Sequence, residues 1–139
     1  MSKFLVVLIV ALLLAPVSAL AADEAKEKAA QQAAEAWLAL IDAGKYGESW
    51  DQASSLFRSK LPRAQWEQAA ASVRQKFGAL QSRSLKLAEY TTELPNAPEG
   101  EYVVLQFDAR YANKADAVET VTPMMDTDGQ WRVTGFFIR

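Results

Sequence analysis

The sequence predicts an α+β fold in which three N-terminal helices pack on a curved four-stranded antiparallel sheet. Apolar residues recur at helical spacing as far as Gly78 and at every second position after it. Glycine and proline separate the periodic segments at Gly44, Pro62 and the stretch 94–100. Helices that come first and strands that follow indicate an α+β domain, because each element must bury its apolar face against another layer.

The first helix is expected from about Asp23 to Ala43. Trp37, Leu38 and Ile41 form its apolar stripe. Gly44 follows as a residue suited to the left-handed C-cap. The alanine-rich first two turns carry little to bury, so we expect them to fray or to dock on a partner.

The second and third helices are expected from Tyr46 to Ser59 and from Pro62 to Phe77. Proline is favoured at the first position of a helix. The stripe of the second helix is Tyr46, Trp50, Ala53, Ser54 and Phe57, and that of the third is Trp66, Ala69, Ala70, Val73 and Phe77. Trp50 is expected to be buried against the sheet, as aromatic stripes at this spacing usually are.

Four strands are expected after Gly78. The first carries Leu85 and Leu87 on one face and ends near Thr92. The second, Glu101 to Tyr111, alternates most regularly, and its apolar face is Val103, Leu105, Phe107, Ala109 and Tyr111.

The last two strands are expected at Val118 to Met125 and Trp131 to Ile138, joined by a hairpin turn at 126–129. Pro123 predicts an edge position or a bulge, because proline cannot donate to the ladder. The apolar residues of the last strand change parity at Gly135, which predicts a bulge or bend there.

The N-terminus has the pattern of a cleaved secretory signal at residues 1–21. Lys3 precedes an uncharged apolar run, and Ala19-Leu20-Ala21 forms a cleavage site before Ala22. The competing interpretation is a retained membrane anchor, since no charge occurs from Phe4 to Ala22. We therefore expect a periplasmic domain at residues 22–139, without a stable membrane span after cleavage.

Charge is unevenly distributed. Seven basic residues and one acidic residue lie between Arg58 and Lys86, although the chain as a whole is acidic. Arg63 and Arg74 are eleven positions apart and are expected on one helix face, where they form a candidate anion-binding surface. Arg83 is expected to turn inward and to need a carboxylate such as Glu119.

Composition excludes several chemistries. The chain has no histidine and no cysteine, so it has no Ser-His-Asp triad, no thiol nucleophile and no ordinary zinc site. We expect no cofactor, no metal and, in an acidic exported chain, no nucleic acid partner. Acid–base catalysis by a carboxylate remains open, with four candidate residues: Asp42, Glu48, Asp51 and Glu119.

The residues from Trp37 to Arg58, WLALIDAGKYGESWDQASSLFR, together with Trp66, Glu119-Thr120-Val121-Thr122 and Asp128-Gly129-Gln130-Trp131, resemble the domain-of-unknown-function family 4019 of exported bacterial proteins. That family carries no established activity, so no catalytic residue can be transferred. The order of elements is also similar to the cystatin-like cone of nuclear transport factor 2-like domains. That superfold hosts both enzymes and binding modules, and the tyrosine and paired carboxylates of its isomerases are not matched here.

The leading functional hypothesis is a non-catalytic domain that binds a small apolar or anionic envelope component, or a protein partner. The residues expected to line its pocket are Tyr46, Trp50, Phe57 and Trp66. A small acid–base enzyme that uses a buried carboxylate near Tyr46 is the first alternative. A structural adaptor that docks through its first helix is the second.

Overall fold

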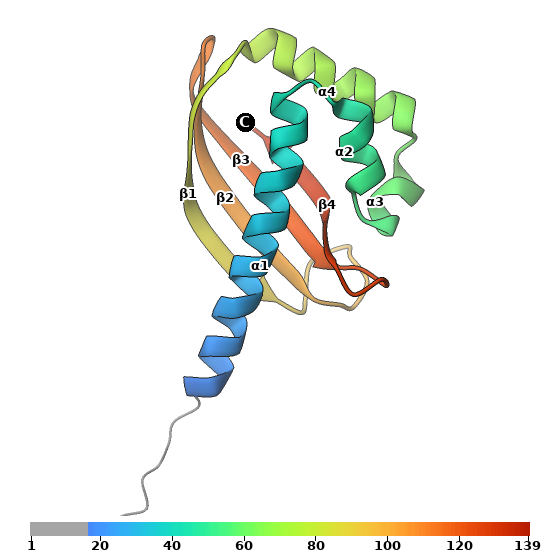
Figure 1. Cartoon of the computed structure of the whole chain (residues 1–139), viewed down its shortest axis with the longest axis vertical. Coiled ribbons are helices and arrows are strands. Elements are labelled where there is room, and N and C mark those ends of the chain that lie inside the picture. Colours follow the sequence, from blue (N-terminus) through green and yellow to red (C-terminus); the bar gives the residue numbers. More distant parts are fainter. Residues whose placement is uncertain (1–16) are drawn as a thin grey trace, which may run out of the picture.

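The computed structural model describes residues 17–139 and has the predicted α+β class (Figure 1). The elements are α1 (Val17–Asp42), α2 (Tyr46–Gln52), α3 (Ser55–Lys60), α4 (Arg63–Phe77), β1 (Leu80–Thr91), β2 (Tyr102–Tyr111), β3 (Lys114–Met125) and β4 (Trp131–Ile138). The strands form an antiparallel meander in the order β1-β2-β3-β4. Helix α1 lies across the concave face of the curved sheet and its first turns project beyond it, while α3 lies beside β4 at the edge of the sheet.

The core lies between α1 and the alternating face of β2, as the two patterns predict. Leu38, Val103 and Leu105 are fully buried, and burial of each such side chain contributes about 1.5–3 kcal/mol. Trp37 stacks on Trp66 with ring centroids 5.6 Å apart. These contacts fix α1 and α4 on the same core.

The predicted second helix is wrong in one respect, because it breaks into α2 and α3. Ala53 and Ser54 have extended backbones, with ψ of 167° and 157°. The Ser54 N–H donates to the carbonyl of Val133 at 2.8 Å, and Ser54 Oγ accepts from the N–H of Phe57 at 3.0 Å. Ser54 is therefore the N-cap of a new helix and not a stripe residue within the old one.

The buried side chain of α2 is Ser49, and the expectation that Trp50 is buried against the sheet is wrong. Ser49 is fully buried, and it accepts hydrogen bonds at 2.8 Å from the indole N–H groups of Trp37 and Trp66. Trp50 is only partly buried and donates to the carbonyl of Leu61 at 2.7 Å. The indole N–H of Trp37 donates to the backbone carbonyl of Ser49 and that of Trp66 donates to its hydroxyl. Both buried indoles thus find the acceptor that they need on this short helix.

Strand β1 is irregular, and the expectation that its two leucines share one face is wrong. Leu85 is 39% exposed and Leu87 is 41% exposed. The register shifts between them, so Leu85 pairs with Phe107 of the core face whereas Leu87 pairs with Gln106 of the other face. Beyond the shift, Ala88 and Tyr90 take the inward positions. An irregularity of this kind at an edge strand cannot be read from alternation alone.

The hairpin of β3 and β4 has the turn and the bulge that the sequence predicts. Gly129 has a φ of 77° and donates to the carbonyl of Asp126 at 3.0 Å. The register shifts by one residue beside Pro123, which places Thr134 as the extra residue before Gly135. The alternative of an edge position for Pro123 is wrong, since β3 is an inner strand.

The predicted signal peptide lies mostly outside the described residues, which begin at Val17. The predicted cleavage site before Ala22 lies within the first turns of α1. Among residues 17–139, no helix is both long enough and apolar enough to cross a membrane.

Candidate functional site

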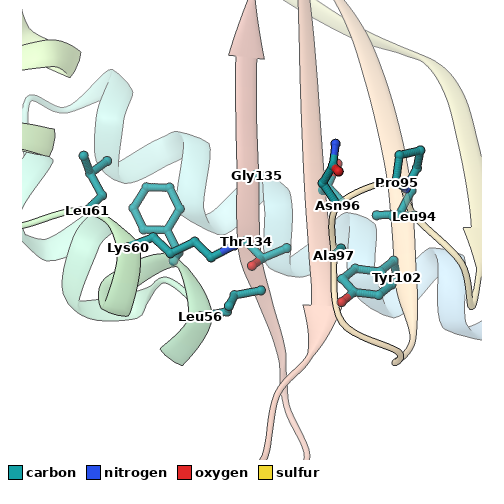
Figure 2. A pocket seen from close by; sticks show the side chains of 12 residues that line it. Leu56, Lys60, Leu61, Leu94, Pro95, Asn96, Ala97, Tyr102, Thr134 and Gly135 are labelled. Carbon is teal, nitrogen blue, oxygen red and sulfur yellow. The ribbon is translucent and has the colours of Figure 1, made fainter.

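A cavity of about 320 Å³ crosses the face of the sheet opposite α1, and we call it the trough. One wall comes from α3 and the residue after it, and the other comes from the loop between β1 and β2 (Figure 2). The twelve residues that define it are Leu56, Phe57, Lys60, Leu61, Leu94, Pro95, Asn96, Ala97, Tyr102, Thr122, Thr134 and Gly135. Its volume is at the lower end of the range for small-molecule sites.

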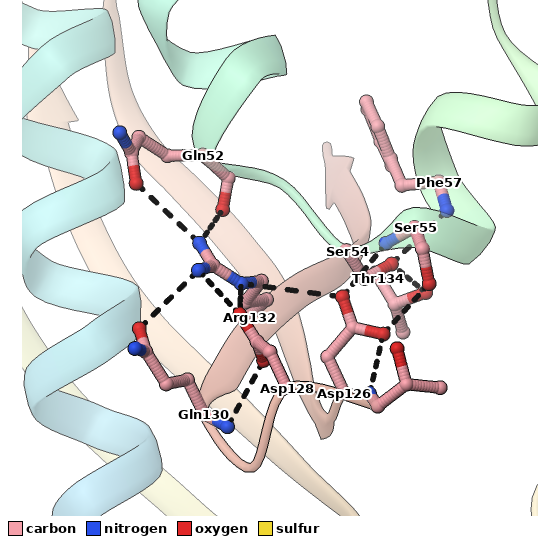
Figure 3. Close-up of polar contacts among 10 residues, drawn as sticks. Gln52, Ser54, Ser55, Phe57, Asp126, Asp128, Gln130, Arg132 and Thr134 are labelled. Atoms are coloured by element: carbon pink, nitrogen blue, oxygen red, sulfur yellow. Dashed lines mark hydrogen bonds and ion pairs between the residues drawn. The ribbon is translucent and has the colours of Figure 1, made fainter.

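The α3 wall is held by four residues that we call the clamp: Ser54, Ser55, Asp126 and Thr134 (Figure 3). The carboxylate of Asp126 accepts from the backbone N–H of Ser55 at 2.9 Å and from its hydroxyl at 2.7 Å. Ser54 Oγ donates to Thr134 Oγ1 at 2.8 Å. Burial raises the pKa of Asp126, but the hydrogen bonds from Ser55 and Thr127 outweigh it, and the net pKa is lowered. A charged Asp126 therefore fixes α3 on the hairpin.

Arg132 adds a second connection between the hairpin and the helices. Its guanidinium donates to Asp128 Oδ2 at 2.6 Å and to the carbonyl of Gln52 at 3.4 Å (Figure 3). Hydrogen bonds from Arg132 hold the pKa of the Asp128 carboxyl below its usual value. The end of α2 is thus tied to the same turn that anchors α3.

The opposite wall is a tight turn at residues 94–97. The N–H of Ala97 donates to the carbonyl of Leu94 at 3.3 Å, and Asn96 has a φ of 62°. Proline in the second position and a left-handed residue in the third are typical of a type II turn. The phenol of Tyr102 donates to the carbonyl of Pro98 at 2.6 Å and so holds the loop against the sheet.

Lys60 is the one charged side chain among the twelve residues of the trough. It forms no ion pair with any of the residues that the structure describes. The remaining polar side chains are neutral, and leucine, proline, alanine and phenylalanine make most of the walls. Such a surface can bind an apolar body and one polar or charged group.

A second polar cluster extends from the buried Glu119 to the surface at Asp42, on the concave side of the sheet. Arg83 donates to Glu119 Oε1 at 2.8 Å and to Asp42 Oδ2 at 2.8 Å, and Arg74 donates to Asp42 Oδ1 at 2.7 Å. Glu119 is fully buried, so the predicted inward turn of Arg83 towards it is confirmed. Burial raises the pKa of Tyr111 to about 12, with the charge of Glu119 as a further cause.

Asp42 and Arg83 stay charged in this cluster. Burial raises the pKa of Asp42, but hydrogen bonds from Arg83 and Arg74 outweigh it, and the net pKa is lowered. Burial alone would lower the pKa of Arg83, but the hydrogen bonds and charges of Asp42 and Glu119 outweigh it, and the net pKa is raised. Both oxygens of Glu119 accept from Arg83. The cluster therefore pairs its charges internally and presents no unpaired carboxylate oxygen for catalysis.

A smaller apolar cleft of about 240 Å³ lies between α4 and β4. Its lining includes Trp66, Val73, Phe136 and Ile138, and Arg74 is its one charged residue. Because Arg74 is already paired with Asp42, this cleft offers no unpaired charge to a ligand.

The sequence-predicted pocket residues are divided between these cavities. Phe57 lines the trough and Trp66 lines the cleft, while Tyr46 and Trp50 line neither. The two predicted anion-binding arginines each pair with carboxylates: Arg63 with Asp51 and Glu67, and Arg74 with Asp42. Within the described part of the chain, no group of three acidic residues is placed to hold a metal ion.

Sequence reasoning missed Lys60 and the turn at 94–97. The two prolines of that turn identify a loop, but nothing in their pattern indicates that it faces α3. The basic stretch drew attention to Arg63 and Arg74, whereas Lys60 is the basic residue of that stretch that the trough contains.

Comparisons with known proteins identify a family and no activity. The family model described as "Protein of unknown function (DUF4019)" matches residues 33–136. No curated protein matches the chain. A solved structure from Catenulispora Acidiphila is similar over 88% of this chain and 91% of its own, with 12% sequence identity and a TM-score of 0.49.

Proposed function

Since the chain belongs to DUF4019, a family of unknown function, we propose from its own geometry that it is an exported, non-catalytic domain that binds a small apolar or amphipathic component of the cell envelope in the trough. The observation that carries this proposal is the construction of the trough. Two segments about forty residues apart form its walls, and each wall is anchored to the sheet by its own hydrogen bonds. A preorganised cavity costs little ordering entropy when a ligand binds.

The acid–base enzyme has one observation in its favour, which is the complete burial of Glu119. Its carboxylate is engaged by Arg83, and Glu119 lines neither the trough nor the cleft. A general base must reach the proton that it removes. Binding without catalysis is therefore the better supported function. The adaptor alternative rests on the exposed first turns of α1, where Leu20 is 68% exposed, and no described cavity lies there.

Gly135 provides a way to fill the trough without breaking the fold. It lies in the floor of the trough, and a Cβ at this position would come no closer than 3.5 Å to Thr122, an ordinary contact distance. Gly135→Val should therefore fold normally and occupy the cavity with its own side chain. Thr120→Val is a matched control, because Thr120 points to the same face of the sheet but lies outside the trough.

The test is native mass spectrometry of the protein purified from the periplasmic fraction. We expect the wild type and Thr120→Val to retain a small molecule that is released on denaturation, and Gly135→Val to lose it. A ligand that stays equally bound to Gly135→Val would place binding outside the trough. Wild-type protein without any retained or extractable ligand would count against a binding function.

A further inference from the structure

We propose that the ligand of the trough carries an oxyanion head, and that Lys60 and Thr134 bind this head while the two walls hold an apolar tail. The inference rests on the proposed binding function and deepens it by naming the chemical class of the ligand. Carboxylate and phosphate heads share this chemistry, whereas ammonium and neutral hydroxyl heads do not.

The first observation is the availability of Lys60. Arg63, Arg74 and Arg83 of the basic stretch are each paired with at least one carboxylate. Its other basic residues, Arg58, Lys76 and Lys86, do not line the trough. Lys60 makes no ion pair with a described residue and lines an otherwise uncharged cavity. Figure 2 shows its side chain extending from α3 towards Thr134 at the floor of the trough. Because Lys60 is exposed to solvent, its attraction for an anion is modest and is weakened by salt.

The second observation is the hydroxyl group of Thr134. Its oxygen lies 2.8 Å from Ser54 Oγ, which also accepts from the N–H of Phe57. A hydroxyl has one donor and two acceptor sites, so Thr134 retains capacity for a hydrogen bond to a ligand. No other side-chain hydrogen bond of Thr134 occurs among residues 17–139. An ammonium and a hydroxyl donor on the same side of a cavity together favour an oxyanion.

The third observation is the apolar character of both walls of the trough. Leu56 and Leu61 belong to one wall, and Leu94, Pro95 and Ala97 belong to the other. These side chains give the ligand's remaining atoms an apolar environment. The matching molecule is a short amphiphile with a single anionic end.

The test compares four probes that have the same eight-carbon tail: octanoate, octyl phosphate, octan-1-ol and octylamine. Binding is followed by amide NMR titration of the mature protein, which reports both affinity and location. We expect octanoate and octyl phosphate to bind about five- to tenfold more tightly than octanol and octylamine to bind most weakly. Raising the salt concentration should weaken the two anions alone. The stronger of the two anions then distinguishes a carboxylate from a phosphate ligand.

Lys60→Met removes the charge and keeps an apolar side chain, so it should reduce octanoate affinity to that of octanol. Lys28→Met is the matched control, because Lys28 is an exposed helical lysine on α1, on the other face of the sheet. Thr134→Val removes the hydroxyl and should weaken octanoate binding. Thr134→Ser keeps the hydroxyl and should bind octanoate as the wild type does.

The outcomes separate the two proposals. Equal trough binding of octanoate and octanol, unaffected by Lys60→Met, would overturn the oxyanion inference and leave a binding function in place. Chemical shift changes outside the trough for all four probes, or none at all, would overturn both.

Discussion

Replacement of Arg83 by methionine tests whether burial makes the interior ion pairs indispensable. The Arg83 side chain is 13% exposed, and it faces Glu119, which is fully buried. Methionine keeps much of the aliphatic length but leaves Glu119 without a counter-charge. Loss of one partner of a buried pair typically costs about 3–5 kcal/mol, a large fraction of the total stability of about 5–15 kcal/mol for a domain.

Arg63→Met is the matched control. Arg63 also bonds two carboxylates, Asp51 and Glu67, but its side chain is 46% exposed. Solvent screening weakens such pairs, so Arg63→Met should cost clearly less stability than Arg83→Met. Chemical denaturation of both variants at neutral pH measures the two losses of unfolding free energy. The comparison holds when the slope of that free energy against denaturant concentration is the same in both variants.

A double variant tests whether the loss comes from the unpaired charge of Glu119. Arg83→Met combined with Glu119→Leu removes both charges, so it should recover most of the stability lost in the single variant, as apolar replacements of buried pairs often do. The reasoning is refuted if Arg83→Met costs no more than Arg63→Met, or if the double variant is less stable than Arg83→Met alone.

Three further predictions concern processing, the core and acid stability. Protein from the periplasmic fraction should begin near Ala22 by terminal sequencing and remain soluble when membranes are pelleted, and an uncleaved N-terminus in the pellet would contradict the signal. Trp66→Ala should cost about 3–5 kcal/mol in denaturation experiments, whereas Trp50→Ala should cost clearly less, because Trp50 is only partly buried; equal losses would contradict this. The pKa of Asp42 is lowered from 3.8 in the folded protein, so its contribution is complete above that pH and is lost as the pH falls through the folded pKa. Asp42→Asn should therefore flatten the decline in unfolding free energy below about pH 4, and an unchanged slope would exclude this role.

Local periodicity was sufficient to predict much of the fold. The stripe of α1 and the alternation of β2 depend on spacing within one element, and both are buried as expected. The turn at Gly129 and the irregularity before Gly135 follow from backbone freedom and a change of parity. The inward position of Arg83 could also be inferred from its strand parity with Leu85 and Leu87, although a register shift turns Leu87 to the other face. Its need for a carboxylate followed from the cost of a buried cation.

The failures have a common cause, which is that distant contacts override local preference. Ser54 ends α2 because the carbonyl of Val133 accepts its N–H, and no helical pattern contains that information. Ser49 is buried because two tryptophans donate to it.

The trough could not be predicted for the same reason. Its walls, around Lys60 and around Asn96, are far apart in the chain and come together only in the folded structure. Their residues are ordinary in composition, and only the fold makes them neighbours.

The most direct test of the central claim is an isotope-filtered NOE experiment on the mature protein with bound octanoate. We expect contacts from the octanoate tail to methyl groups of both walls, Leu61 on one side and Leu94 on the other. Contacts to Val73 in the α4–β4 cleft, with none to Leu61 or Leu94, would contradict it.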